Sequence, residues 1–195
     1  ASVSAAGAIL ILILCWRLPR AAERGVHDWS AAALRRAFAG GSPLPMEVLR
    51  GFEQKFNVRI LEGYGLSETS PIATFNKPER ERPGSVGFPV WGVDVRVVDE
   101  NGNDVEKGEL GEIIIRGHNI MKGYYKREEA TREAVKDGWF YSGDVGRFDE
   151  EGYLFISDRV KDMILRGGFN VYPRELEEVL MTHEAVSLCA VVGVP

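Results

Sequence analysis

Residues 62–71 read EGYGLSETSP, and they follow residues 58–61, a short apolar run that predicts a β-strand. A strand that leads into Gly-Tyr-Gly lets the backbone approach a flat ligand closely, and the ring of Tyr64 can stack on a base. Thr69 offers a hydroxyl, and Glu68 offers the hard oxygen ligand that Mg²⁺ takes beside a phosphate. A turn capped by the hydroxyl residues of the string is the alternative interpretation.

Upstream of this string, the pattern predicts a turn followed by a helix. Gly40-Gly41-Ser42-Pro43 is typical of a turn, and Pro45 suits the first position of a helix over residues 45–56. Apolar residues recur in that helix at helical spacing: Val48, Leu49, Phe52 and Phe56. Asn57 can end it, and the strand over 58–61 follows.

Downstream of Pro83 the pattern changes to short strands separated by turns. Valines alternate with charged residues over 93–97, and Asp99-Glu100-Asn101-Gly102 is a hairpin signal. Further strands are predicted over 112–116, 138–141, 145–148 and 153–156, with a turn at 149–152. Strands and turns at this spacing predict a β-rich subdomain, either a barrel or a sandwich.

After Asp158 the pattern changes again and predicts the start of a new α/β unit. Residues 161–165 are typical of a strand, Gly167-Gly168 of a flexible turn, and Pro173 of a helix start. That helix carries an apolar stripe of Leu176, Val179 and Leu180. A buried strand is predicted over 185–194.

Two further segments carry polar groups suited to a ligand. In Tyr141-Ser142-Gly143-Asp144, an Asp at a tight turn after a strand can accept hydrogen bonds from both hydroxyls of a ribose. The alternative is an Asp that forms the turn and binds nothing. Charged residues over 157–166, where the pattern of short strands and turns ends, indicate a domain junction, and a solvated linker is the alternative there.

Composition excludes several classes of function. Lys and Arg total 24 against 29 Asp and Glu, for a net charge of -5 without a basic cluster, so we expect no nucleic-acid partner. The apolar run over 5–16 is shorter than the roughly 20 residues of a membrane helix. We expect it to be a buried strand or helix, without stable membrane insertion; a membrane-anchored protein is the alternative. The spacing of Cys and His predicts no zinc site.

In their order and spacing, several motifs together resemble the adenylate-forming superfamily: acyl-CoA synthetases, aryl-CoA ligases, firefly luciferases and adenylation domains of peptide synthetases. The motifs are Gly40-Gly41-Ser42-Pro43-Leu44, Tyr64-Gly65-Leu66-Ser67-Glu68-Thr69, Gly108-Glu109-Leu110-Gly111-Glu112, Gly123-Tyr124-Tyr125, Tyr141-Ser142-Gly143-Asp144 and Asp158-Arg159-Val160-Lys161-Asp162. Residues 161–177, KDMILRGGFNVYPRELE, look most like the fatty acyl-CoA synthetase branch. The resemblance runs from about residue 28 to the end.

The resemblance implies a nucleotide site formed by Gly41, Ser42, Pro43, Tyr64, Gly65, Thr69, Asp144 and Arg159. In such a site Tyr64 would stack on the adenine, and Thr69 would hydrogen-bond a phosphate oxygen of ATP or of the acyl adenylate. Glu68 would help hold Mg²⁺. Asp144 would bind the ribose hydroxyls, with Arg159 near the ribose and the phosphate.

The resemblance also implies a mobile C-terminal part. Lys161 would be the hinge about which a small domain rotates, since a hinge needs mainly to tolerate a large change in φ and ψ. Gly167 and Gly168 would lie in a loop that swings toward the channel for the thiol.

The implied chemistry has two steps. A carboxylate, in this branch that of a fatty acid, attacks the α-phosphate of MgATP and gives acyl-AMP and pyrophosphate. A thiol, that of coenzyme A, then displaces AMP. The alternatives are an adenylating enzyme that loads a carrier-protein thiol, and a non-catalytic truncated remnant. Because the reaction uses ATP and coenzyme A, we expect the cytoplasm as its location.

The expected fold is a mixed α/β class. Residues 1–158 would be the distal part of the large adenylate-forming domain, with the β-rich subdomain over about 84–157. Residues 159–195 would be the hinge and the beginning of a small α+β domain. The family's phosphate loop and its C-terminal catalytic lysine have no counterpart in these 195 residues, so we expect the isolated chain to be inactive.

Overall fold

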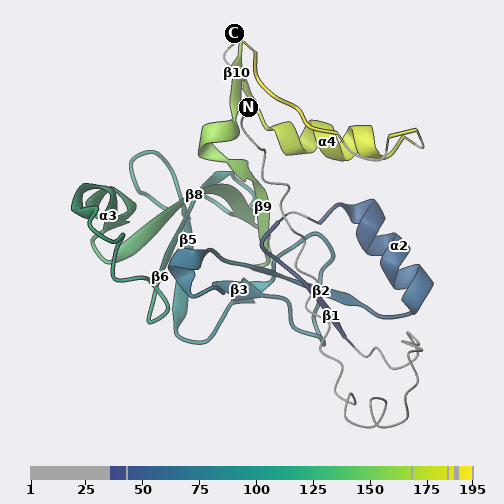
Figure 1. Cartoon of the computed structure of the whole chain (residues 1–195), viewed down its shortest axis with the longest axis horizontal. Helices are drawn as coiled ribbons and strands as arrows, with labels where there is room; N and C mark the ends of the chain where they lie inside the picture. The colour runs from purple at the N-terminus through teal and green to yellow at the C-terminus, as the bar shows by residue number, and fades with distance from the viewer. Residues whose placement is uncertain (1–35, 43, 168, 184, 187–188, 195) are drawn as a thin grey trace.

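The computed structural model describes residues 36–42, 44–167, 169–183, 185–186 and 189–194. The apolar run at 5–16, Pro43 and Gly168 lie outside the described residues, so the predictions made for them stay predictions. The described chain forms a mixed α/β structure, as the sequence predicted, with sheets and few helices. Figure 1 shows α2 (Met46–Phe56) and α3 (Glu128–Ala134) at opposite ends of the strands in that view.

The first sheet has the order β1-β2-β3-β4. β1 (Ala37–Ala39) pairs in parallel with β2 (Ile60–Tyr64), and antiparallel β3 (Thr74–Phe75) and β4 (Phe88–Pro89) follow. Parallel neighbours need a crossover, and α2 (Met46–Phe56) provides it. The predicted helix is confirmed, but it begins one residue later than predicted, because Pro45 is extended and precedes it as the N-cap residue.

The end of α2 follows the sequence prediction closely. Asn57 adopts the left-handed conformation with φ of 51°, and its N–H donates to the carbonyl of Glu53. Asn is among the residues that tolerate this conformation, which is why it ends helices. On the inner face of α2, Leu49 is buried in a small apolar cluster with Ala37 and Ala39 of β1 and Ile60 of β2.

The second sheet is antiparallel, with the order β5-β6-β8-β7 and β9 paired to β8. Its strands are β5 (Val93–Val98), β6 (Gly111–Gly117), β7 (Val135–Lys136), β8 (Trp139–Phe148) and β9 (Leu154–Arg159). The β-rich character predicted for this region is confirmed, and the reversals at 99–102 and 149–152 occur as predicted.

One correction concerns β8, which replaces two separately predicted strands over 138–141 and 145–148. The strand continues through Ser142 and Gly143 but is irregular there, since Gly143 adopts φ of 72°, a conformation that other residues rarely take. The registers of β8 against β6 and against β9 both shift beside this point. Such irregularities bend a strand and redirect its side chains.

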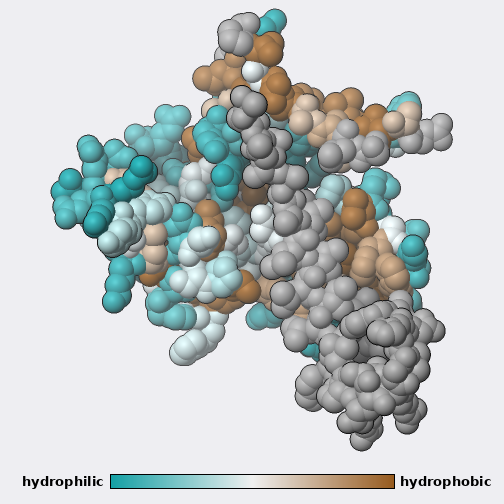
Figure 2. Space-filling model, in the orientation of Figure 1, coloured by the Kyte–Doolittle hydropathy of each residue, from teal (hydrophilic) through white to brown (hydrophobic). Residues whose placement is uncertain are grey.

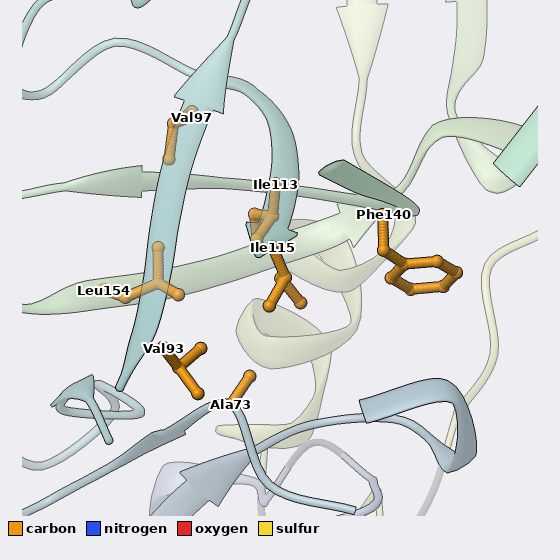
Figure 3. Packing of buried hydrophobic residues seen from close by; sticks show 7 residues of the cluster. All are labelled: Ala73, Val93, Val97, Ile113, Ile115, Phe140 and Leu154. Atoms are coloured by element: carbon orange, nitrogen blue, oxygen red, sulfur yellow. The ribbon is translucent and has the colours of Figure 1, made fainter. Parts of the chain in front are cut away.

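The main core lies on one face of this sheet. Figure 3 shows side chains converging from β5, β6, β8 and β9, with Ala73 beside them. The buried members of this cluster are Ala73, Val93, Val97, Ile113, Ile115, Phe140 and Leu154. Ile114, on the opposite face of β6, is also buried, so this strand is covered on both sides.

The C-terminal part differs from its prediction in several places. The chain forms a short 3₁₀ helix, η3 (Val160–Asp162), and the strand predicted over 161–165 begins later, as β10 (Ile164–Arg166). β10 pairs with β11 (Phe169–Val171), and α4 (Pro173–Met181) begins at the predicted proline.

The buried strand predicted over 185–194 is wrong for the described residues of that segment. None of them pairs with a described strand, and Val192 and Val194 are 73% and 83% exposed. The segment is instead attached to α4, because the N–H of Val191 donates to the carboxylate of Glu177 at 2.8 Å. A strand needs a neighbouring strand to satisfy its backbone, and the described chain offers none there.

The apolar residues predicted to form a stripe on α4 do lie on this helix, but they are exposed. Leu176, Val179 and Leu180 all face solvent in the described structure. Figure 2 shows apolar side chains gathered along α4 and beside β10. No helix within the described ranges combines the length and the apolar character needed to cross a membrane.

Shortening a core side chain tests the placement of the main core. Ile115→Ala removes buried methyl groups, so we expect the free energy of unfolding to fall by about 2–5 kcal/mol. Urea denaturation followed by tryptophan fluorescence measures it. Ile72→Ala makes the same chemical change at a position that is 41% exposed, and we expect a loss below about 1 kcal/mol. Equal losses in the two variants would contradict the assigned core.

Candidate functional site

A cavity of about 890 Å³ lies between β2, the adjoining ends of β8 and β9, and α4; we call it the β2–β9 cavity. It brings together many of the site residues predicted from the sequence. These are Gly41, Ser42, Tyr64, Gly65, Asp144, Arg159 and Lys161. Glu68, Thr69 and Gly167 do not line it. A cavity of this size suits a drug-sized or nucleotide-sized ligand.

Three of these residues are in direct contact. The Tyr64 hydroxyl donates to Asp144 Oδ2 at 2.7 Å, and Arg159 Nε lies 3.1 Å from Asp144 Oδ1. The sheet register explains the second contact, because Asp144 on β8 pairs with Arg159 on β9. Tyr64 reaches the same carboxylate from the end of β2, in the other sheet. Residues 80 positions apart in sequence thus share one polar cluster.

The electrostatics of the cluster follow from burial. Asp144 is 5% exposed, and this burial raises the pKa of its carboxyl group, although Tyr64 and Arg159 offset part of the rise. Burial also raises the pKa of Tyr64 well above its usual range, and the charge of Asp144 adds to the effect. Tyr64 therefore stays protonated and acts as a donor, and Asp144 is the acceptor.

The backbone around Asp144 is held by its neighbours. The Ser142 hydroxyl donates to the Ile113 carbonyl at 2.7 Å and accepts from the Asp144 N–H at 3.1 Å. Glu112 Oε1 accepts from the Gly143 N–H at 3.0 Å. Sequence reasoning quoted Glu112 as part of a motif without a role. Its carboxylate fixes the turn that presents Asp144 to the cavity.

Gly65 lines the cavity, but its lack of a side chain has a cause within the chain. A Cβ built on Gly65 would lie 2.0 Å from the Pro71 carbonyl oxygen. The close approach that the sequence suggested for a ligand is therefore made by the chain's own backbone at this position. Any larger residue would push residues 71–72 away.

Thr69 and Glu68 lie in the 3₁₀ helix η2 (Ser67–Thr69), outside the cavity lining. The Thr69 hydroxyl accepts from the Leu66 N–H at 2.9 Å and donates to the Leu66 carbonyl at 3.0 Å, and the residue is fully buried. The alternative interpretation of the string, a turn capped by a hydroxyl, thus describes Thr69 in this structure. Its hydroxyl is held by the turn.

Glu68 is half-buried, and its Oε1 accepts a hydrogen bond from the Tyr124 hydroxyl at 2.9 Å. The described residues contain no group of three or more His, Cys, Asp or Glu that could hold a metal ion. Mg²⁺ commonly takes one or two protein carboxylates and completes its shell with phosphate oxygens and water. A single carboxylate such as Glu68 fits that mode of binding and requires a phosphate ligand beside it.

Sequence reasoning missed a second buried carboxylate in the cavity. Glu62 is 7% exposed, and its Oε2 accepts from the Gly84 N–H at 3.0 Å. Burial raises the pKa of Glu62, while the Gly84 hydrogen bond and the charge of Arg174 lower it. The spacing of Glu62 and Tyr64, two residues apart on β2, places both side chains on one face of the strand, and this signal could have indicated Glu62.

Arg174 was also missed, and it connects α4 to β9. The backbone N–H of Arg174 donates to Asp158 Oδ2 at 3.1 Å, and its guanidinium Nη1 donates to the Ile156 carbonyl at 2.8 Å. The carboxylate of Asp158 thereby caps the first turn of α4. The charged run over 157–166 had indicated a junction at this point, but its partner in α4 could not be read from the sequence.

Comparisons with known proteins agree with this arrangement. Residues 5–125 match the family described as AMP-binding enzyme, and the match begins ahead of residue 28, where we expected the resemblance to start. A long-chain-fatty-acid–CoA ligase from Yersinia pestis is 47% identical over 165 residues, which cover 84% of this chain and 29% of that ligase. The chain thus spans less than a third of this relative's length.

Solved structures give the same result for the fold. An anthranilate CoA ligase in complex with anthranoyl-AMP is similar with a TM-score of 0.80 and 34% identity, over 84% of this chain and 32% of the other. An o-succinylbenzoate CoA synthetase from Bacillus subtilis, in complex with ATP and a magnesium ion, gives 0.75 and 35% identity, over 83% and 34%. With the family match covering residues 5–125, this chain belongs to the AMP-binding enzymes, the adenylate-forming family that includes the acid–CoA ligases.

Proposed function

We propose that the chain is part of an acyl-CoA synthetase and that the β2–β9 cavity binds the nucleotide of ATP and of the acyl adenylate. The observation that carries the proposal is the buried Asp144 at the cavity wall, contacted by Tyr64 and Arg159. A carboxylate in this setting can accept hydrogen bonds from ribose hydroxyls. Arg159 supplies positive charge close to where the α-phosphate would lie.

The remaining predicted residues have roles around the same nucleotide. Gly41 and Ser42, with Pro43, form the adenine wall, and Tyr64 packs on the base while its hydroxyl holds Asp144. Glu68 and Thr69 serve the phosphates, with Glu68 as a ligand of Mg²⁺. Because the Thr69 hydroxyl is engaged with Leu66, its contact with a phosphate requires a rearrangement of η2.

The C-terminal part carries the second half of the proposal. Lys161 acts as the hinge between a large domain ending near residue 158 and a small domain. The loop with Gly167 and Gly168 then moves toward the thiol of coenzyme A. Lys161 lines the cavity and lies in η3, shortly before the β10–β11 hairpin that carries the loop. This position suits a hinge that moves the loop.

The acid is proposed to be a fatty acid. The Yersinia relative is named as a long-chain-fatty-acid–CoA ligase, and residues 161–177 resemble that branch. The named structural neighbours act on anthranilate and o-succinylbenzoate, so the family accepts other acids. ATP, Mg²⁺ and coenzyme A are the proposed cofactors, and the cytoplasm, where they occur, is the proposed location.

The proposed chemistry needs charge neutralisation more than a nucleophile from the protein. A fatty-acid carboxylate attacks the α-phosphate, and pyrophosphate leaves. Positive charge near the phosphate and alignment of the attacking oxygen lower the barrier. Arg159 and Mg²⁺ supply the charge in this account, and Asp144 fixes the ribose so that the α-phosphate is held in one place.

Removing the charge of Asp144 tests the nucleotide site. We expect Asp144→Asn to raise the dissociation constant for AMP about 10- to 100-fold, because a hydrogen bond to a charged group contributes about 1.5–3 kcal/mol. Isothermal titration calorimetry on the 195-residue chain measures it. Asp94→Asn, at an exposed Asp on β5, is the matched control and should leave AMP binding unchanged. Equal affinities of Asp144→Asn and the parent chain would refute the site.

The raised pKa of Asp144 predicts a pH dependence. The ionised carboxylate accepts stronger hydrogen bonds from the ribose hydroxyls than the neutral acid does, so affinity should fall as the pH is lowered through this pKa. The loss should begin above the ordinary Asp value of about 3.9. Adenosine is the ligand to use, because it carries no phosphate that titrates. Binding to Asp144→Asn should show no such transition; a transition of the same size in both proteins would assign it to another group.

A pyrophosphate assay tests the expected inactivity of the isolated chain. Given ATP, Mg²⁺ and a fatty acid, the 195-residue chain should release no acid-dependent pyrophosphate, because the phosphate loop and the catalytic lysine have no counterpart in its sequence. A coupled pyrophosphate assay checks this, and turnover above that of a denatured control would contradict it.

A chimera tests the acceptor. Residues 36–194 replace the matching segment of the Yersinia ligase, and coenzyme A is compared with a phosphopantetheine-bearing carrier protein. Thioester formation on coenzyme A supports the synthetase, and formation on the carrier protein supports the first alternative. A folded chimera that binds AMP and forms neither thioester supports the non-catalytic remnant.

A further inference from the structure

The motif Gly123-Tyr124-Tyr125 has no role in the nucleotide site as described so far. In the structure, residues 119–124 lie against the loop of residues 66–72, which carries Glu68. We call residues 66–72 the Glu68 loop. Asn119 Nδ2 donates to the Thr69 carbonyl at 2.9 Å and to the Ile72 carbonyl at 2.7 Å. One side chain thus binds both ends of the turn that follows Glu68.

Glu68 itself is held at two points by the same segment. The N–H of Met121 donates to the Glu68 carbonyl at 2.8 Å, and the Tyr124 hydroxyl donates to Glu68 Oε1 at 2.9 Å. Within the described part of the chain, no donor reaches Oε2 of this carboxylate. The carboxylate is therefore fixed through one oxygen, and its second oxygen keeps its capacity to bind a cation.

Tyr124 is in turn fixed from α3 (Glu128–Ala134). The hydroxyl of Thr131 accepts from the Tyr124 N–H at 2.9 Å and donates to the Arg127 carbonyl at 2.9 Å. Burial and the bond to Glu68 raise the pKa of Tyr124, so it remains a donor wherever Glu68 is ionised. The neighbouring Tyr125 is 85% exposed and makes no hydrogen bond to Glu68.

We propose that Tyr124 is a positioning residue that orients the Glu68 carboxylate toward the divalent cation accompanying the nucleotide phosphates. The inference rests on the proposed function, in which Glu68 is a ligand of Mg²⁺. A ligating carboxylate held by an outer hydrogen bond keeps one orientation, and loss of such partners typically costs about 10–100-fold in metal affinity. Asn119 and Met121 hold the backbone of the same loop.

The test compares nucleotide binding with and without metal on the 195-residue chain. The probes are ATP with Mn²⁺ and ATP in EDTA, titrated by calorimetry, and the readout is the ratio of the two affinities. Tyr124→Phe removes one oxygen atom and should reduce the advantage given by Mn²⁺ about tenfold, with ATP affinity in EDTA unchanged. Tyr125→Phe makes the same chemical change next door and should match the parent chain.

A second variant guards against an effect of folding. Glu68→Gln keeps an oxygen for Tyr124 but loses the charge, so it should reduce the metal advantage at least as much. Tyr124→Phe added to Glu68→Gln should then change nothing further, because the two act through one carboxylate. Thermal unfolding midpoints of all variants check that the chain stays folded.

The outcomes separate this inference from the proposed function. An unchanged metal advantage in Tyr124→Phe overturns the inference, even if the variant is less stable. So does a parent chain that binds adenosine through Asp144 but gains nothing from Mn²⁺, in which case the nucleotide site still stands. A chain that binds neither adenosine nor ATP overturns both proposals.

Discussion

The position of β8 between β6 and β9 is the constraint on which the rest of the structure depends. Through its hydrogen bonds to both strands, β8 supplies Phe140 to the main core and Asp144 to the cavity within five residues. The change of face between these two functions is made at Ser142-Gly143, where the backbone leaves the regular extended conformation. At this turn, the N–H groups of Gly143 and Asp144 donate to the side chains of Glu112 and Ser142. The core and the polar cluster are thus two results of one irregular strand.

The cavity holds two buried carboxylates, Asp144 and Glu62, and the pKa of each is raised by burial. Burying such groups is unfavourable unless they are hydrogen-bonded and offset by positive charge. Each has a donor from the large part of the chain, Tyr64 for Asp144 and Gly84 for Glu62. Each also has an arginine from beyond residue 158, Arg159 and Arg174. Each arginine therefore offsets one buried carboxylate, which favours the arrangement in which Arg159 and Arg174 face the cavity. Glu178 opposes the second pair, because its charge raises the pKa of Glu62.

Much of the fold could be predicted from local sequence, and the reasons are visible in particular elements. The helix α2 has a proline at its start, an apolar stripe and Asn57 at its end, so each of its features is local. The seven-residue helix α3 buries none of its residues and gave no stripe to detect. The strands β3 and β4 have two residues each, too few for a period. The segment over 185–194 is apolar in composition, but its conformation depends on a neighbouring strand that the described chain lacks.

The site was predicted in part for the same reason. Tyr64, Asp144 and Arg159 were found through motifs, and the sheet register brings them together. The roles of Glu62, Glu112, Tyr124 and Arg174 were not predicted, although Glu112 and Tyr124 stand in quoted motifs, because only the fold identifies the partner of each. The bond between Asp158 and Arg174 has a mechanical meaning for the proposed hinge, since its two ends lie on either side of Lys161. A rotation there would have to break this bond and uncap α4, so the contact that starts the helix would also bias the chain toward the present arrangement.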